Sequence, residues 1–106
     1  MNDYPQMSYL AQLFPTLRAA PGVEPFDAEK LLRWCATSPA LTAGGAHAIA
    51  FLLSVYNPDA DWRLEAKERG LDAPDSIPFD AVRAMRTWDA PHRRAFLVWA
   101  EKPVFP

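Results

Sequence analysis

The chain has 106 residues, half of them hydrophobic and 23% charged, with a formal net charge of −2. This length allows one hydrophobic core but not two domains of usual size, and the composition excludes a disordered polar chain. The small net charge excludes a polyanion binder that depends on bulk charge, so residues 1–106 are predicted to form a single domain.

Eleven prolines divide the chain into helical windows, because a proline inside a helix loses a backbone hydrogen bond and clashes with the preceding turn. The first window, residues 6–14, places Met7 and Phe14 on one apolar stripe. Pro15 is expected either to kink this helix or to separate it from a short second window over residues 16–20.

The next two windows are predicted to be a capped helix and a central helix. Asp27 can accept hydrogen bonds from the unpaired N–H groups of a helix that runs to about Thr37. The following helix begins either after the Ser-Pro step at 38–39 or after Thr42, and the Asn-Pro step at 57–58 stops it. Because this third helix is apolar on every side, we expect it at the centre of the fold.

A short exposed helix is predicted over residues 62–69, where charges of both signs alternate. Gly70 is in position to terminate it, and residues 71–78 are predicted to be a loop. No window alternates between apolar and polar residues over the length of a strand, which argues against any β-sheet.

Two more capped helices are predicted at the C-terminal end. Asp80 caps a helix through Trp88, and Asp89 caps the last helix, which Pro103 ends. The sequence therefore predicts an all-α fold, a small helical bundle of about five helices.

The chain also contains an internal echo. The motif Pro-Phe-Asp-Ala occurs twice, each copy is followed by a tryptophan, and each is then followed by His-x-x-Ala-Phe-Leu and a proline. The echo predicts a repeat of residues 25–58 and 78–103, folded as two pseudo-symmetric αα-hairpins whose histidine-bearing helices face each other. The alternative is that helix capping and proline stops produced the same pattern without any duplication.

The side chains that could support catalysis are Cys35, His47 and His92. A histidine pair can transfer protons near neutral pH, and a cysteine beside a basic group can be a nucleophile. The favoured interpretation is structural, a buried cysteine and satisfied histidines, because no further part of a catalytic constellation is present. A single cysteine and the lack of an HExxH or Cys/His cluster predict no metal, no cofactor and no enzymatic activity.

The uncharged stretch from Trp34 to Pro58 raises the question of a membrane span. Its apolar part, residues 40–56, contains Gly44 and His47 and falls short of the ~20 apolar residues that a span needs. The N-terminal segment lacks the basic start and unbroken apolar run of a secretory signal. With only one cysteine as well, we expect no membrane association and a reducing, cytoplasmic location.

Arginine and aromatic side chains are the strongest candidates for binding a partner, because these residue types dominate interface hot spots. A tryptophan in a polar setting and a phenylalanine in the apolar tip Val104-Phe105-Pro106 could either complete the core or dock a partner. Four arginines that flank a turn between two helices could contact phosphates. The candidate residues are Trp62, Arg83, Arg86, Arg93, Arg94 and Phe105.

The predicted function is a non-enzymatic interaction or accessory module that binds another protein or a second copy of itself. Binding of nucleic acid through the basic region from Arg83 to Arg94 is the first alternative, and it would show a steep salt dependence. A small enzyme that uses Cys35, His47 or His92 is the second alternative.

Overall fold

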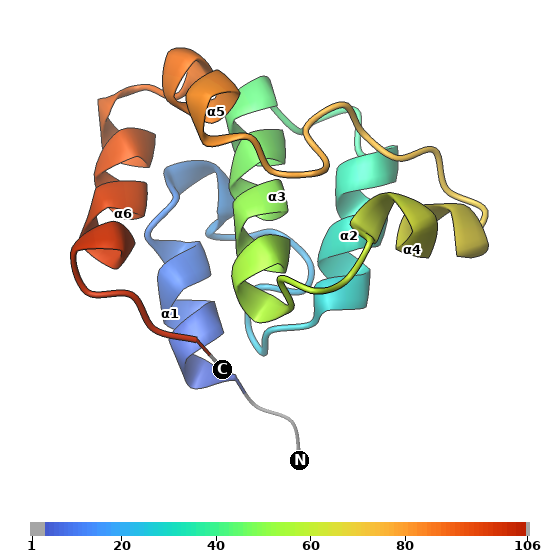
Figure 1. The fold of residues 1–106 in the computed structure, drawn as a ribbon, viewed down its shortest axis with the longest axis horizontal. Helices are drawn as coiled ribbons and strands as arrows, with labels where there is room; N and C mark the ends of the chain where they lie inside the picture. Colours follow the sequence, from blue (N-terminus) through green and yellow to red (C-terminus); the bar gives the residue numbers. More distant parts are fainter. Residues whose placement is uncertain (1–3, 106) are drawn as a thin grey trace.

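The computed structural model describes residues 4–105, which form six α-helices and one 3-10 turn, with no strand in that range (Figure 1). The prediction of an all-α helical bundle is confirmed. Residues 1–3 lie outside the described residues, and so does Pro106, the last residue of the predicted apolar tip. The elements are α1 (Pro5–Gln12), the 3-10 turn η1 (Pro15–Leu17), α2 (Ala28–Thr37), α3 (Ala43–Tyr56), α4 (Trp62–Glu68), α5 (Ala81–Thr87) and α6 (Ala90–Glu101).

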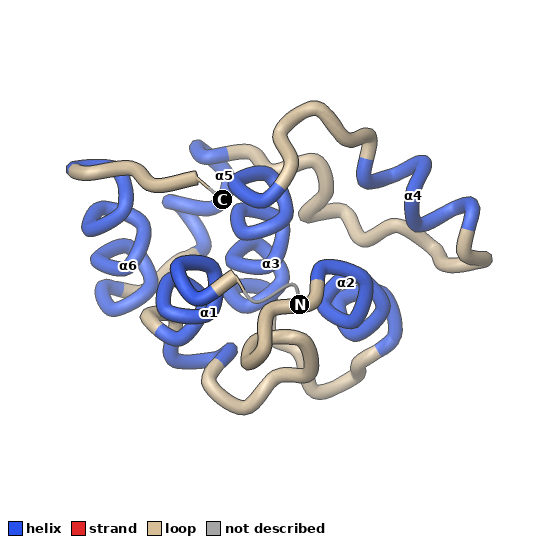
Figure 2. The backbone as a smooth tube through the Cα atoms, turned by 90° about the horizontal axis from the view of Figure 1, so that it is seen from below, coloured by secondary structure: helices blue, strands red, loops and turns tan. Residues whose placement is uncertain are grey.

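Helix α3 is the centre of the bundle, as its composition predicts. It packs against α1, η1, α2 and α5, and Figure 2 shows it with α1 and α2 on either side. Every residue from Ala48 to Leu53 is buried, as expected of a helix that is apolar all round. No helix in residues 4–105 is both long enough and apolar enough to cross a bilayer.

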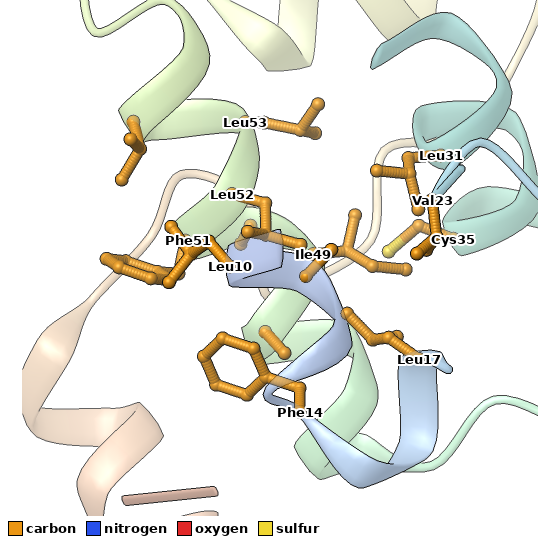
Figure 3. Close-up of a cluster of buried hydrophobic side chains, with 14 of the residues drawn as sticks. Leu10, Phe14, Leu17, Val23, Leu31, Cys35, Ile49, Phe51, Leu52 and Leu53 are labelled. Atoms are coloured by element: carbon orange, nitrogen blue, oxygen red, sulfur yellow. The ribbon is translucent and has the colours of Figure 1, made fainter. Parts of the chain in front are cut away.

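The core lies where the first three helices and η1 converge. Leu10 and Phe14 approach α3 from the N-terminal segment, and Leu31 and Cys35 approach it from α2 (Figure 3). Burying a large apolar side chain contributes about 1.5–3 kcal/mol. Packing against α3 therefore decides how these elements are arranged.

Side-chain caps begin all five α-helices that follow η1. In each case a side-chain oxygen accepts a hydrogen bond of 3.0–3.1 Å from the backbone N–H three residues later. The predicted starts are confirmed, and of the two alternatives for α3 the earlier one, after the Ser-Pro step, is wrong. The capping residues are Asp27, Thr42, Asp61, Asp80 and Asp89.

Two helix ends show how proline and glycine act. Helix α1 ends at Gln12, earlier than predicted, because Phe14 precedes Pro15 and has the extended backbone that this position favours, with φ −87° and ψ 114°. Helix α4 ends at Glu68, one residue before the predicted Arg69, and Gly70, the predicted terminator, follows the C-cap with a positive φ of 73°. The N–H of Leu71 then reaches back 2.9 Å to a carbonyl of α4, which closes the helix end.

Both copies of the Pro-Phe-Asp-Ala motif start a helix that packs against α3, namely α2 and α5. Their tryptophans differ, because Trp34 is half-buried whereas Trp88 is 1% exposed and its Nε1 donates to the carbonyl of Gly44 at 2.9 Å. Helices α3 and α6 meet through Phe51 and Phe96, whose ring centroids lie 5.2 Å apart. The helix starts recur in the two copies, but the tryptophans have different surroundings. The repeat and its pseudo-twofold symmetry therefore stay predictions.

Candidate functional site

The single cysteine is a buried part of the core. Cys35 lies on α2 and is 8% exposed. Burial raises the pKa of its thiol to about 11, and the nearby Ser76 hydroxyl offsets this effect only in part. The group is therefore protonated near neutral pH, whereas a cysteine nucleophile acts as a thiolate.

The two histidines have different partners. The Nδ1 of His92 lies 2.7 Å from a carboxylate oxygen of Asp89, and its Nε2 lies 2.8 Å from the hydroxyl of Thr16. The Nδ1 of His47 has no hydrogen-bond partner among the described residues, and burial, together with the charge of Arg83, lowers the pKa of this ring. Nor does any group of three or more His, Cys, Asp or Glu side chains in residues 4–105 have the arrangement of a metal site.

Two of the four arginines in the predicted basic region donate hydrogen bonds to backbone carbonyls of the protein, and the other two have no such bond in the described residues. Arg83 donates to a carbonyl of the loop before α5 at 3.2 Å, and Arg93 donates to a carbonyl of α5 at 3.1 Å. Arg86 and Arg94 are exposed. Within the described part of the chain, none of the four lies within ion-pair distance of a carboxylate. Their charges are therefore available to an acidic partner.

The two aromatic candidates have different environments. Trp62 is half-buried at the start of α4, and its Nε1 donates to the carbonyls of Leu53 at 3.1 Å and Asn57 at 3.3 Å. It therefore ties α4 to the end of α3. Phe105 is 59% exposed and packs edge-on against Trp99, with ring centroids 5.7 Å apart. Only Phe105 presents most of its surface to solvent.

An apolar groove of about 460 Å³ lies between α1 and the C-terminal end of α6. The tail after α6 folds back beside it, because the Nε1 of Trp99 donates to the carbonyl of Val104 at 3.0 Å. Figure 1 shows this tail running from α6 toward the start of α1. The lining includes Tyr9, Leu13, Val98, Trp99, Lys102 and Val104.

Part of the groove lining is strongly exposed, and the charged residue among its described lining is basic. Tyr9 is 67%, Val98 50% and Val104 44% exposed. Among the described residues that line the groove, only Lys102 is charged, and it is the C-cap residue just after α6. Arg94 lies one helical turn before Val98 on α6. The groove therefore combines an apolar floor with a basic edge.

The sequence pointed to the C-terminal tail and to Arg94 as candidates for binding a partner, but not to most of the residues that line the groove. One signal was present, because Tyr9 falls outside the apolar stripe of its own helix and so points an aromatic ring outward. Val98 gave no comparable signal, since it lies in an almost continuous apolar run. Pairing Tyr9 with Val98 requires contacts between opposite ends of the chain.

No protein-family model, no curated protein and no solved structure matches this chain. A proposal about its function therefore depends on the geometry of these surfaces.

Proposed function

We propose that this protein is a non-enzymatic interaction module that holds an acidic, amphipathic segment of a partner protein in the groove between α1 and α6. The observation that carries the proposal is the exposed apolar lining, in which Tyr9, Val98 and Val104 are each at least 44% exposed. Covering a concave apolar surface of this kind removes it from water, which lowers the free energy of the complex. An amphipathic helix can supply the cover by laying its apolar face into a groove between two helices.

The acidic character of the partner follows from the charge around the groove. Lys102 lines it, and Arg94 lies one helical turn before the lining residue Val98 on α6, with no carboxylate in ion-pair distance among the described residues. Acidic residues that flank an apolar anchor would complement this edge and would speed association at low salt. Phe105, beside Trp99, would extend the apolar contact.

Selection from a library of displayed random peptides tests the proposal. We expect the purified protein to select peptides with apolar residues at helical spacing and with flanking Asp or Glu. Val98→Glu should abolish their binding, because it adds a negative charge to the apolar floor. Val82→Glu is the matched control, since Val82 is also an exposed helical valine, at 71%, but does not line the groove. Selected peptides that are basic, or that bind both variants equally well, would contradict the proposal.

A second copy of the chain is the competing occupant of the groove. Sedimentation velocity over a range of concentrations distinguishes the two cases. We expect a monomer whose mass does not change with Val98→Glu. A dimer that dissociates in Val98→Glu but not in Val82→Glu would show that the groove is a self-association surface, and the proposal of a separate partner would be wrong.

Nucleic-acid binding through the basic region receives less support from the contacts. Arg83 and Arg93 already donate to backbone carbonyls of the protein, and Arg94 belongs to the edge of the apolar groove. Phosphate-binding surfaces are instead polar and strongly positive. We therefore favour a protein partner.

A further inference from the structure

A second cavity, of about 450 Å³, lies where the start of α1, the start of α2 and the end of α3 come together. It shares no lining residue with the apolar groove. Four of its lining residues are aromatic and come from four separate segments, a combination that no local sequence motif announces. These residues are Tyr4, Phe26, Tyr56 and Trp62.

The aromatic rings pack against one another, two pairs almost at right angles and two pairs tilted, at 45° and 44°. Tyr4 lies nearly perpendicular to Tyr56, at 87° with centroids 5.3 Å apart, and to Phe26, at 86° and 6.4 Å. The ring centroid of Trp62 lies 6.4 Å from that of Tyr56. The indole N–H of Trp62 donates to the carbonyls of Leu53 in α3 and of Asn57, which directly follows α3. Phe26 is 4% exposed and is the most buried of the four rings. The rings are thus positioned by the fold itself.

A carboxylate without a cationic partner adjoins these rings. Asp27 lines the cavity, and its hydrogen bond within residues 4–105 is to the backbone N–H of Lys30 at 3.1 Å, with no cationic side chain in ion-pair distance. The hydroxyl of Tyr4 raises the pKa of Tyr56, and burial and the Asp27 charge raise it further, so the field of this carboxylate reaches the phenol of Tyr56.

Two cations also line the cavity, and they differ in how they are compensated. Arg69 lies 2.9 Å from Glu65 and 3.6 Å from Glu29, a second carboxylate of the cavity lining that Arg33 shares at 3.6 Å, so carboxylates offset the charge of Arg69. Lys30 is exposed and has no ion pair in the described part of the chain. Its ammonium group should weaken the attraction of the cavity for a positive ligand, and removing it should strengthen that attraction.

We infer that this aromatic pocket binds a methylated ammonium group, carried either by a free molecule such as choline or by a methylated lysine side chain. The negative faces of aromatic rings attract a cation, and the effect is largest when the cation sheds water readily. Methyl groups spread the charge and pack against the rings, whereas a bare ammonium ion is strongly hydrated. The carboxylate of Asp27 supplies the opposite charge at the edge of the pocket.

Titration of the full chain with tetramethylammonium chloride and with choline tests the inference by the NMR shifts of amide and indole N–H groups. We expect saturable shifts confined to the pocket, including the indole of Trp62. The neutral carbon isostere of choline, dimethylbutanol, should produce no saturable shift. Equal effects of choline and its neutral isostere, or no saturable shift with either cation, would overturn the inference.

Matched variants separate charge recognition from folding. Asp27→Asn should weaken choline binding about fivefold to tenfold, while the asparagine preserves the helix cap. Asp80→Asn makes the same change at the cap of α5, outside the pocket, and should leave binding unchanged. Lys30→Gln should strengthen binding. Equal losses in the two asparagine variants would contradict the role of the Asp27 charge.

Peptides identify the source of the methylated group. Tighter binding of a trimethyl-lysine peptide than of choline would assign the pocket to a modified protein, and the reverse order would assign it to a free small molecule. A peptide with unmodified lysine should bind more weakly than its trimethylated form. Measurable and equal affinity of the two peptides would show that methylation is not recognised and would overturn the inference. None of these results depends on the apolar groove, so the two proposals fail independently.

Discussion

Buried polar side chains decide how individual residues of this protein respond to pH. His92 is satisfied by Asp89 and Thr16 on its two ring nitrogens, whereas the Nδ1 of His47 lacks a partner among the described residues. An unpaired polar atom in a buried position is costly, and a charge there costs more. His47 is therefore the histidine whose protonation should disturb the fold.

We predict that the protein loses stability on mild acidification through His47. Burial lowers the pKa of its ring below the ordinary 6.5 and Arg83 lowers it further, while Asp80 opposes them. The unfolded chain then binds the proton first, so stability is complete above about pH 6.5 and falls as the pH drops below that value. Urea unfolding of the natural chain and of His47→Gln at several pH values checks this. An equal decline in both proteins would show that other groups are responsible.

At the scale of single elements, turns with positive φ depend on glycine to different degrees. Gly22 and Gly70 have φ values of 88° and 73°. A Cβ on Gly22 would lie 2.6 Å from the carbonyl oxygen of Asp27, whereas one on Gly70 would meet nothing within 4 Å. The first turn is therefore constrained by both backbone and packing, and the second by backbone alone.

We expect Gly70→Ala to lower the free energy of unfolding by about 1 kcal/mol, the ordinary cost of placing an L-residue in this backbone region. Gly22→Ala should cost clearly more, because the backbone of the turn must also move away from the new methyl group. Chemical denaturation of the two variants under the same conditions gives the comparison. Equal losses would mean that the turn before α2 relaxes without cost.

At the scale of the whole molecule, aromatic rings connect the C-terminal helix to the rest of the bundle. The ring of Phe51, at the centre of α3, lies 5.0 Å from that of Trp99 and 5.2 Å from that of Phe96. Trp99 in turn lines the apolar groove. The position of α6, and with it one wall of the groove, therefore depends on this cluster.

We predict that Phe51→Ala destabilises the protein by about 3–5 kcal/mol, the usual cost of deleting a buried phenylalanine. Phe51→Leu should cost less and should retain the fold, so peptide binding in the groove can be measured with it. Thermal unfolding of the three proteins provides the order of stability. A melting temperature of Phe51→Ala equal to that of the natural chain would disprove the role of the cluster.

Much of the fold could be predicted because helix boundaries are local. Asp27, Asp80 and Asp89 each cap a backbone N–H three residues away, so their role needs no knowledge of distant contacts. The candidate sites could not be predicted in the same way. The sequence left open whether Trp62 completes the core or docks a partner, and its bonds to the backbone carbonyls of Leu53 and Asn57 appear only in the folded chain.

Periodicity, capping and proline within single segments predicted the all-α class, the central place of α3 and the helix starts, except that of α3, for which two starts stayed open. Which helices are neighbours became clear from the folded chain. It brought Tyr9 beside Val98, and Tyr4 beside Tyr56. The physical reason is that packing between distant segments depends on the complementary shape of whole helix faces, which no local pattern of residues contains.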